Sequence, residues 1–243
     1  TLSSSSAASD VYKRQPMRSS ISQNQLNDAV AQLPSTSTSN TNYQLFLLES
    51  ARIAFLNEEY EKSRQTFSQA YAIVEREQGE ANIRIGRGVE KLNALVTNDN
   101  AISYQLAPYE QSMLHTYQAL NYLYTDGLES ALVEVRRANI VQEQALEHYE
   151  AELVNAKSED PGINWQQVDA ALSPLDSRIG EVKNGFQNAY TFYLSGLLYE
   201  AAGQLNDAYI DYKKALEIYS NNSFLQQDVL RLGSVLGMDN DLK

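Results

Sequence analysis

Two histidines and a pair of adjacent arginines are the side chains in this 243-residue chain whose types could do chemistry. Neither His115 nor His148 lies in an HExxH or similar spacing, so a zinc site would need carboxylates from distant parts of the sequence. The chain has no cysteine, which excludes disulfides, thiolate zinc sites, iron–sulfur centres and cysteine nucleophiles. We therefore expect no metal site and no cofactor.

The arginine pair offers two readings. Arg136 and Arg137 follow Glu134 closely, and guanidinium groups suit the binding of an anion or phosphate. Arginine and glutamate on neighbouring helices also form purely structural pairs, and the sequence leaves both readings open. The chain has no glycine-rich phosphate loop, no nucleophile elbow and no Ser/His/Asp arrangement. We expect that the protein is not an enzyme.

Composition favours helices. Proline (5 residues) and glycine (11 residues) are scarce, and alanine, leucine, glutamine and glutamate are plentiful, which predicts an all-α protein. The formal net charge of -12 repels phosphate backbones, so nucleic acid is not an expected partner. The sequence has no apolar run of about 18 residues that could span a bilayer.

Residues 1–42 are expected to lie outside the folded body. The opening run TLSSSSAASDVYKRQ is polar and of low complexity, and we expect it to be disordered. Its end, Asp10 to Gln15, is also what the end of a commonly used transposase sequencing adapter encodes, so our hypothesis is that residues up to about 15 replace a lost native N-terminus. A weak helix (24–33) and a Ser/Thr/Asn linker follow.

Helical spacing of apolar residues begins at Tyr43, and we expect one helical domain over residues 43–243. A polar break at residues 57–59 separates two helices, and the second of them is expected to end near Gln78. The later helices are expected over residues 81–96, 109–124, 128–154, 177–202, 204–219 and 223–236.

A 34-residue repeat organises these helices. The last hairpin fits the tetratricopeptide pattern at Phe192, Gly196, Tyr199, Ala208, Tyr212 and Ala215. Each type has a steric reason: Gly196 and Ala208 let the two helices approach closely, Tyr199 and Tyr212 fill the space, and Gly203 permits the turn.

Two earlier stretches fit the same pattern less completely. ALNYLYTDGLESALVEVRRA, residues 119–138, places Asp126-Gly127 at the turn, and a first hairpin fits at Ala51, Tyr60, Ser63, Phe67 and Ala70. We predict tetratricopeptide-like hairpins at about 44–77, 112–145 and 189–222, stacked as a short α-solenoid. An irregular helical bundle is the alternative.

The runs over residues 95–144 and 188–216, which contain ALNYL and YLSGLLYEA, resemble a family of uncharacterised bacterial envelope proteins. Members of that family typically carry a lipoprotein signal followed by tetratricopeptide-like hairpins. The resemblance implies a periplasm-facing protein attached to the outer membrane by a lipidated N-terminal cysteine. Because this chain has no cysteine, such an anchor would have been lost with the native N-terminus.

In stacked hairpins the first helices line a concave face that suits a peptide or a partner helix, and tyrosine, with 16 residues, supplies apolar area and a hydroxyl there. We predict a scaffold or adaptor that binds another protein, with Arg52 and Glu200 tuning selectivity. The alternatives are a self-associating structural lipoprotein without a ligand groove, an enzyme hidden in residues 95–108 and the arginine pair, and tyrosines that merely fill space between repeats. The predicted groove residues are Arg52, Phe55, Met113, Thr116, Leu120, Tyr124, Tyr190, Tyr193, Leu197 and Glu200.

Overall fold

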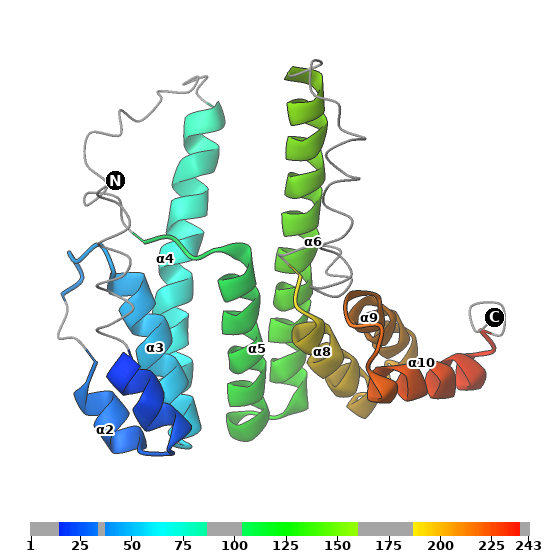
Figure 1. Cartoon of the computed structure of the whole chain (residues 1–243), viewed down its shortest axis with the longest axis horizontal. Helices are drawn as coiled ribbons and strands as arrows, with labels where there is room; N and C mark the ends of the chain where they lie inside the picture. The colour runs from blue at the N-terminus through cyan, green and yellow to red at the C-terminus, as the bar shows by residue number, and fades with distance from the viewer. Residues whose placement is uncertain (1–14, 34–36, 87–103, 160–186, 239–243) are drawn as a thin grey trace. The chain divides into compact units, whose positions relative to one another are not determined.

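A computed structural model describes residues 15–33, 37–86, 104–159 and 187–238, and side chains only outside 80–86 and 149–159. The described residues form helices joined by turns, with no strand among them, which confirms the all-α prediction. The chain divides into two units, Thr1–Leu106 and Ala107–Lys243. Each unit is described by itself (Figure 1).

The first unit contains a helix over residues 15–22, α2 (Leu26–Ala31), α3 (Tyr43–Leu56) and α4 (Tyr60–Gly86). α3 and α4 pack side by side and are joined by the predicted polar break, where Glu58 adopts a φ of 61°. The boundary expected at Tyr43 coincides with the start of α3. The chain before it nevertheless packs on this helix, because Met17 and Ala29 form a small apolar cluster with Ile53.

The expected end of the first hairpin near Gln78 needs correction, because α4 continues through Gly79 to Gly86. Gly79 is exposed, and an added Cβ would meet no atom within 4 Å. A single exposed glycine costs a helix about 1 kcal/mol relative to alanine, and the surrounding glutamate, glutamine and alanine residues favour helix. Residues 1–14 of the opening run and most of the helix expected over 81–96 lie outside the described residues.

The second unit contains two helical hairpins and a final helix. α5 (Pro108–Thr125) and α6 (Leu128–Glu159) form the first hairpin, and α8 (Ala189–Ala201) and α9 (Leu205–Ile218) form the second. α10 (Ser223–Leu236) packs on α9, and α8 contacts both helices of the preceding hairpin. The expected helix over 177–202 is described only from Ala189, and the part before residue 187 lies outside the description.

Both predicted glycine turns are present in this unit. Gly127 has a φ of 98° and Gly203 a φ of 75°, a region that favours glycine because a Cβ would clash with the backbone. The N–H of Gly127 donates to the carbonyl of Tyr122 (2.8 Å), and that of Gln204 donates to the carbonyl of Tyr199 (2.9 Å). These bonds close the two helix ends and reverse the chain.

Asparagine side chains start two of these helices. Asn188 accepts a hydrogen bond from the N–H of Tyr190 (2.9 Å) at the start of α8. Asn222 accepts from the N–H groups of Phe224 (3.0 Å) and Leu225 (3.2 Å) at the start of α10. Such caps satisfy N–H groups that have no partner within the helix, and each stabilises its helix by about 1 kcal/mol.

The core of the second unit contains the residues that define the repeat. An alanine side chain at Gly196 would place its Cβ 2.5 Å from Cδ1 and Cε1 of Tyr212, so the two helices meet at a distance only glycine permits. Four repeat residues of the last hairpin are fully buried in this core, Phe192, Ala208, Tyr212 and Ala215, and Tyr199 is 7% exposed. The steric roles predicted for Gly196, Tyr212 and Ala208 are therefore present.

Candidate functional site

A stripe of apolar side chains runs along the outer side of α5. Met113, Tyr117, Leu120 and Tyr124 recur at the three- and four-residue spacing that places side chains on one face of a helix. Tyr124 is 60% exposed, and the other three are half-buried. The stripe is therefore accessible to solvent, most of all at Tyr124, while its other side chains are partly covered by neighbouring residues.

α8 carries a matching stripe of Tyr190, Leu194 and Leu197, of which Tyr190 is 53% and Leu197 41% exposed. Asn188 Nδ2 lies 3.2 Å from the sulfur of Met113, and the hydroxyls of Thr116 and Thr191 lie 2.9 Å apart. The partners in both contacts are separated by 75 residues, so α5 and α8 run parallel and in register there.

The two stripes face the same way. Thr191 points from α8 toward α5, whereas Glu200 points toward α10, and the α8 stripe lies between these two contact lines. Burial raises the pKa of the Tyr190 hydroxyl, and Tyr117 adds to this effect. We call the combined surface of Met113, Tyr117, Leu120, Tyr124, Tyr190, Leu194 and Leu197 the first-helix face.

Thr116 does not belong to this face, contrary to the sequence prediction. It is 3% exposed, and its hydroxyl donates to the carbonyl of Ser112 (2.7 Å) in addition to contacting Thr191. The reason is its place in the helix, since position 116 is covered by α8 while positions 113, 117 and 120 stay partly exposed. Thr116 thus joins helices and is not available to a ligand.

Glu200 and Tyr193 face α10 and also depart from the prediction. Arg231 donates to both carboxylate oxygens of Glu200 (2.6 and 2.8 Å), and the hydroxyl of Tyr212 donates to the same group (3.0 Å). Hydrogen bonds from Arg231 and then Tyr212 hold the pKa of Glu200 below its usual range. The Tyr193 ring lies 5.7 Å from that of Tyr212, centre to centre. Glu200 is therefore committed to holding α10.

Arg52 and Phe55 lie on α3 in the first unit, whereas the first-helix face belongs to the second unit. Arg52 is exposed, and Phe55 is half-buried with its ring 5.6 Å from that of Tyr60, edge to face. That Arg52 and Phe55 contact a ligand stays a prediction.

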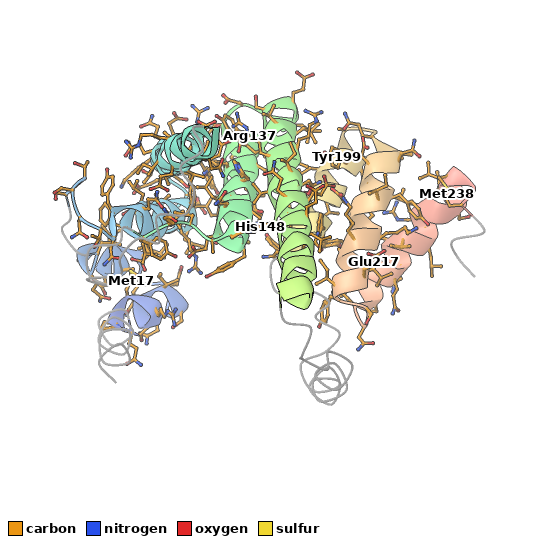
Figure 2. The ribbon with its side chains drawn as sticks, turned by 90° about the horizontal axis from the view of Figure 1, so that it is seen from above. Met17, Arg137, His148, Tyr199, Glu217 and Met238 are labelled. Atoms are coloured by element: carbon orange, nitrogen blue, oxygen red, sulfur yellow. The ribbon has the colours of Figure 1, made fainter. Side chains whose placement is uncertain are left out.

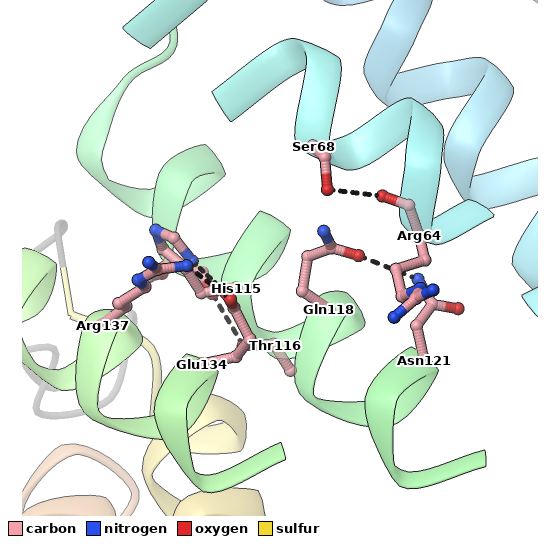
Figure 3. A network of polar contacts seen from close by, with 9 residues as sticks. Arg64, Ser68, His115, Thr116, Gln118, Asn121, Glu134 and Arg137 are labelled. Carbon is pink, nitrogen blue, oxygen red and sulfur yellow. Dashed lines mark hydrogen bonds and ion pairs between the residues drawn. The ribbon is translucent and has the colours of Figure 1, made fainter. Parts of the chain in front are cut away.

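The arginine pair separates into two different environments. Arg137 donates to Oε1 of Glu134 (2.7 Å), whose other oxygen lies 2.7 Å from Nδ1 of His115 (Figure 3). His115 is 1% exposed and the Glu134 side chain 4%, so these two form a buried pair between α5 and α6, and Arg137, with its side chain 43% exposed, joins it from the surface. Arg136 is exposed and lies instead beside a cavity between α6 and α9.

The described part of the chain has no group of three or more His, Asp or Glu residues placed to hold a metal ion. Within those same ranges, no helix combines the length and apolar character needed to cross a bilayer.

Sequence reasoning missed Tyr117 and Leu194 on the face and Arg231 as the partner of Glu200. Tyr117 and Leu194 were within reach, because each lies three or four residues from predicted members of the same stripe. Sequence spacing does not indicate the contact between Arg231 and Glu200, because that contact depends on how α10 packs against the preceding helices.

Comparison of the chain with models of protein families, with curated proteins and with solved structures found no match.

Proposed function

We propose that this chain is a tetratricopeptide-like helical-hairpin protein that binds a segment of another protein along its first-helix face. The single observation that carries the proposal is the apolar stripe on two parallel first helices, which is partly exposed along its length and more than half exposed at Tyr124 (60%) and Tyr190 (53%). Exposed aromatic groups on a rigid surface are typical anchors for protein recognition, because they bury large area with little loss of side-chain freedom.

The stacking of hairpins as a short α-solenoid is part of this proposal. Its support is the close approach of Gly196 and Tyr212, the two turn glycines and the parallel register of α5 and α8. A stack of this kind exposes its first helices along one side, which is the surface on which an extended peptide or amphipathic helix can lie.

The ligand for this face would be an apolar segment. The face carries three tyrosines, two of them highly exposed, and no acidic or basic side chain, so recognition would rest on area burial and on hydroxyl hydrogen bonds. We assign the protein a role as scaffold or adaptor in the bacterial envelope, facing the periplasm and held at the outer membrane by an N-terminal lipid. That location rests on the family resemblance alone.

A displayed peptide library tests this function. Peptides selected on the intact protein should bind a Tyr124→Ala, Tyr190→Ala double variant at least ten-fold more weakly, because each truncation removes a large buried contact worth about 1–2 kcal/mol. Tyr219→Ala is the matched control, since Tyr219 is 57% exposed at the end of α9 and outside the face. Equal peptide affinity of the original protein, the double variant and the Tyr219→Ala control would refute the proposal.

Self-association without a ligand groove is the second candidate function. It is favoured by the outer side of α10, where Phe224 is 70%, Val235 66% and Leu230 52% exposed. End helices of helical stacks usually present a polar outer surface, so this apolar end is a candidate contact between copies. Light scattering at increasing protein concentration tests it, and a constant monomer mass would exclude it.

A further inference from the structure

A cavity of about 350 Å³ opens between α6 and α9, on a different part of the second unit from the first-helix face. Tyr199 reaches it from α8, between these two helices (Figure 2). Its volume is at the lower end of the range of small-molecule sites, about 300–1,000 Å³. The cavity combines apolar walls with charged groups, and nothing in the proposed function uses it.

One of the residues that line the cavity is an aspartate, Asp211, that forms no ion pair among the described residues. Asp211 is 3% exposed, and its Oδ2 accepts a hydrogen bond from Asn139 Nδ2 (2.7 Å). Among the described residues Oδ1 of Asp211 accepts no hydrogen bond, and no lysine or arginine nitrogen forms an ion pair with this carboxylate. Asp211 lines the cavity, so a nearly buried carboxylate with one hydrogen-bond donor and no ion-pair partner among the described residues stands there, which is costly unless a ligand meets it.

The cations around the cavity compensate this charge only in part. Lys214 pairs with Glu143 (2.7 Å), and Arg136 is exposed with no ion-pair partner in the described residues. With Asp207 also at the cavity, three carboxylates stand against two cations, so the lining carries an excess of one negative charge when all are ionised. Burial raises the pKa of Asp211 to about 6, with Asp207 and Glu143 adding to it against Asn139 and Lys214. The group is therefore ionised at pH 8.

Two exposed isoleucines form the apolar walls. Ile140 on α6 is 50% exposed and Ile210 on α9 is 48% exposed, and both line the cavity that contains Asp211. A flexible hydrocarbon stem between them would bury part of this exposed area while its charged end reached Asp211. Lysine side chains bind in this way, with an apolar stem and a compact ammonium group.

We propose that this cavity binds a primary ammonium group on a short apolar stem, with the ammonium at Asp211 Oδ1 and the stem between Ile140 and Ile210. The ammonium would supply the hydrogen-bond donors and the positive charge that Asp211 lacks. A lysine side chain of a partner protein and a free alkylamine offer the same chemistry.

Nuclear magnetic resonance titration of the whole chain at pH 8, followed at isoleucine methyl groups, tests this site. n-Pentylamine should shift the signals of Ile140 and Ile210 saturably, and n-pentanol, which has the stem without the charge, should not. Nα-acetyl-lysine N-methylamide separates the two sources: binding comparable to n-pentylamine assigns the site to lysine side chains, and binding of n-pentylamine alone assigns it to free amines. Both results support the proposal.

Asp211→Asn should weaken n-pentylamine binding by about ten-fold or more, because a charge-assisted hydrogen bond to a buried group is lost. Asp228→Asn is the matched control, since Asp228 lies on α10 beside Arg231, outside the cavity, and its affinity should equal that of the original protein. Circular dichroism confirms that both variants are folded. Affinity of the Asp211→Asn variant within two-fold of the original, equal shifts with n-pentanol, or no saturable shift with n-pentylamine would overturn the proposal.

Discussion

The contact between Gly196 and Tyr212 makes the strongest prediction about stability. Gly196→Ala would place a Cβ 2.5 Å from two ring carbons of Tyr212, about 1 Å inside ordinary van der Waals contact. The ring has little room to retreat, because Tyr212 is fully buried and its hydroxyl donates to Glu200 (3.0 Å). The clash must therefore move α8, α9 or both.

The magnitude follows from two opposing terms. Overpacking of a well-packed core costs about 1–3 kcal/mol, and replacing glycine by alanine within a helix returns about 1 kcal/mol. We expect the free energy of unfolding of the Gly196→Ala variant to be lower than that of the original chain by up to about 2 kcal/mol. Gly79→Ala is the control, since Gly79 is exposed in α4 and its new methyl group would meet no atom within 4 Å, and it should stabilise the protein by about 0.5–1 kcal/mol.

Urea denaturation followed by circular dichroism measures both effects. Repeating Gly196→Ala in a Tyr212→Leu background completes a double-mutant cycle, and the cost should fall there because the ring atoms nearest the new Cβ are gone. Stabilisation of the same size for Gly196→Ala and Gly79→Ala would refute the close approach and, with it, the main support for the tetratricopeptide-like hairpin.

Three further predictions concern charge and surface in the second unit. Burial raises the pKa of Asp211 from 3.8 to about 6, so the original chain should lose stability as pH rises through that interval. The Asp211→Asn variant should be more stable than the original chain by about 3 kcal/mol at pH 8, but not below pH 4. Thermal unfolding measured across this pH range tests both expectations. Arg231→Ala should speed hydrogen exchange in α10 relative to α9, with a modest loss of about 0.5–1 kcal/mol since the Arg231 side chain is 47% exposed; unchanged exchange would show that Glu200 does not hold this helix. Phe224→Asp should abolish any concentration-dependent mass seen by light scattering, and persistence of oligomers would move the contact elsewhere than α10.

The helices and turns could be predicted because their causes are local. Glycine at positions 127 and 203 marks a φ that other residues avoid, and the spacing of apolar residues finds α5, α9 and α10 almost to the residue. The pairing of Gly196 with Tyr212 was also within reach, since the repeat pattern relates residues across a hairpin. The continuation of α4 through Gly79 was not, because one weak residue does not outweigh its helix-forming neighbours.

The candidate site was predicted less well, because exposure depends on neighbours that the sequence does not identify. Thr116 and Tyr124 both lie on α5, yet α8 covers only the first. Glu200 looks like a free groove residue until α10 brings Arg231 to it. The uncompensated charge of Asp211 arises in the same way, from the packing of α9 against α6.

Photo-crosslinking from the first-helix face tests the central claim most directly. A photoreactive phenylalanine analogue is placed singly at Tyr124, Tyr190 or Tyr219, three positions that are each more than half exposed. Crosslinking is then measured with a peptide selected on the unmodified protein. The account predicts crosslinks from positions 124 and 190 and none above background from position 219. Equal crosslinking from all three positions, or crosslinking from position 219 alone, would contradict it.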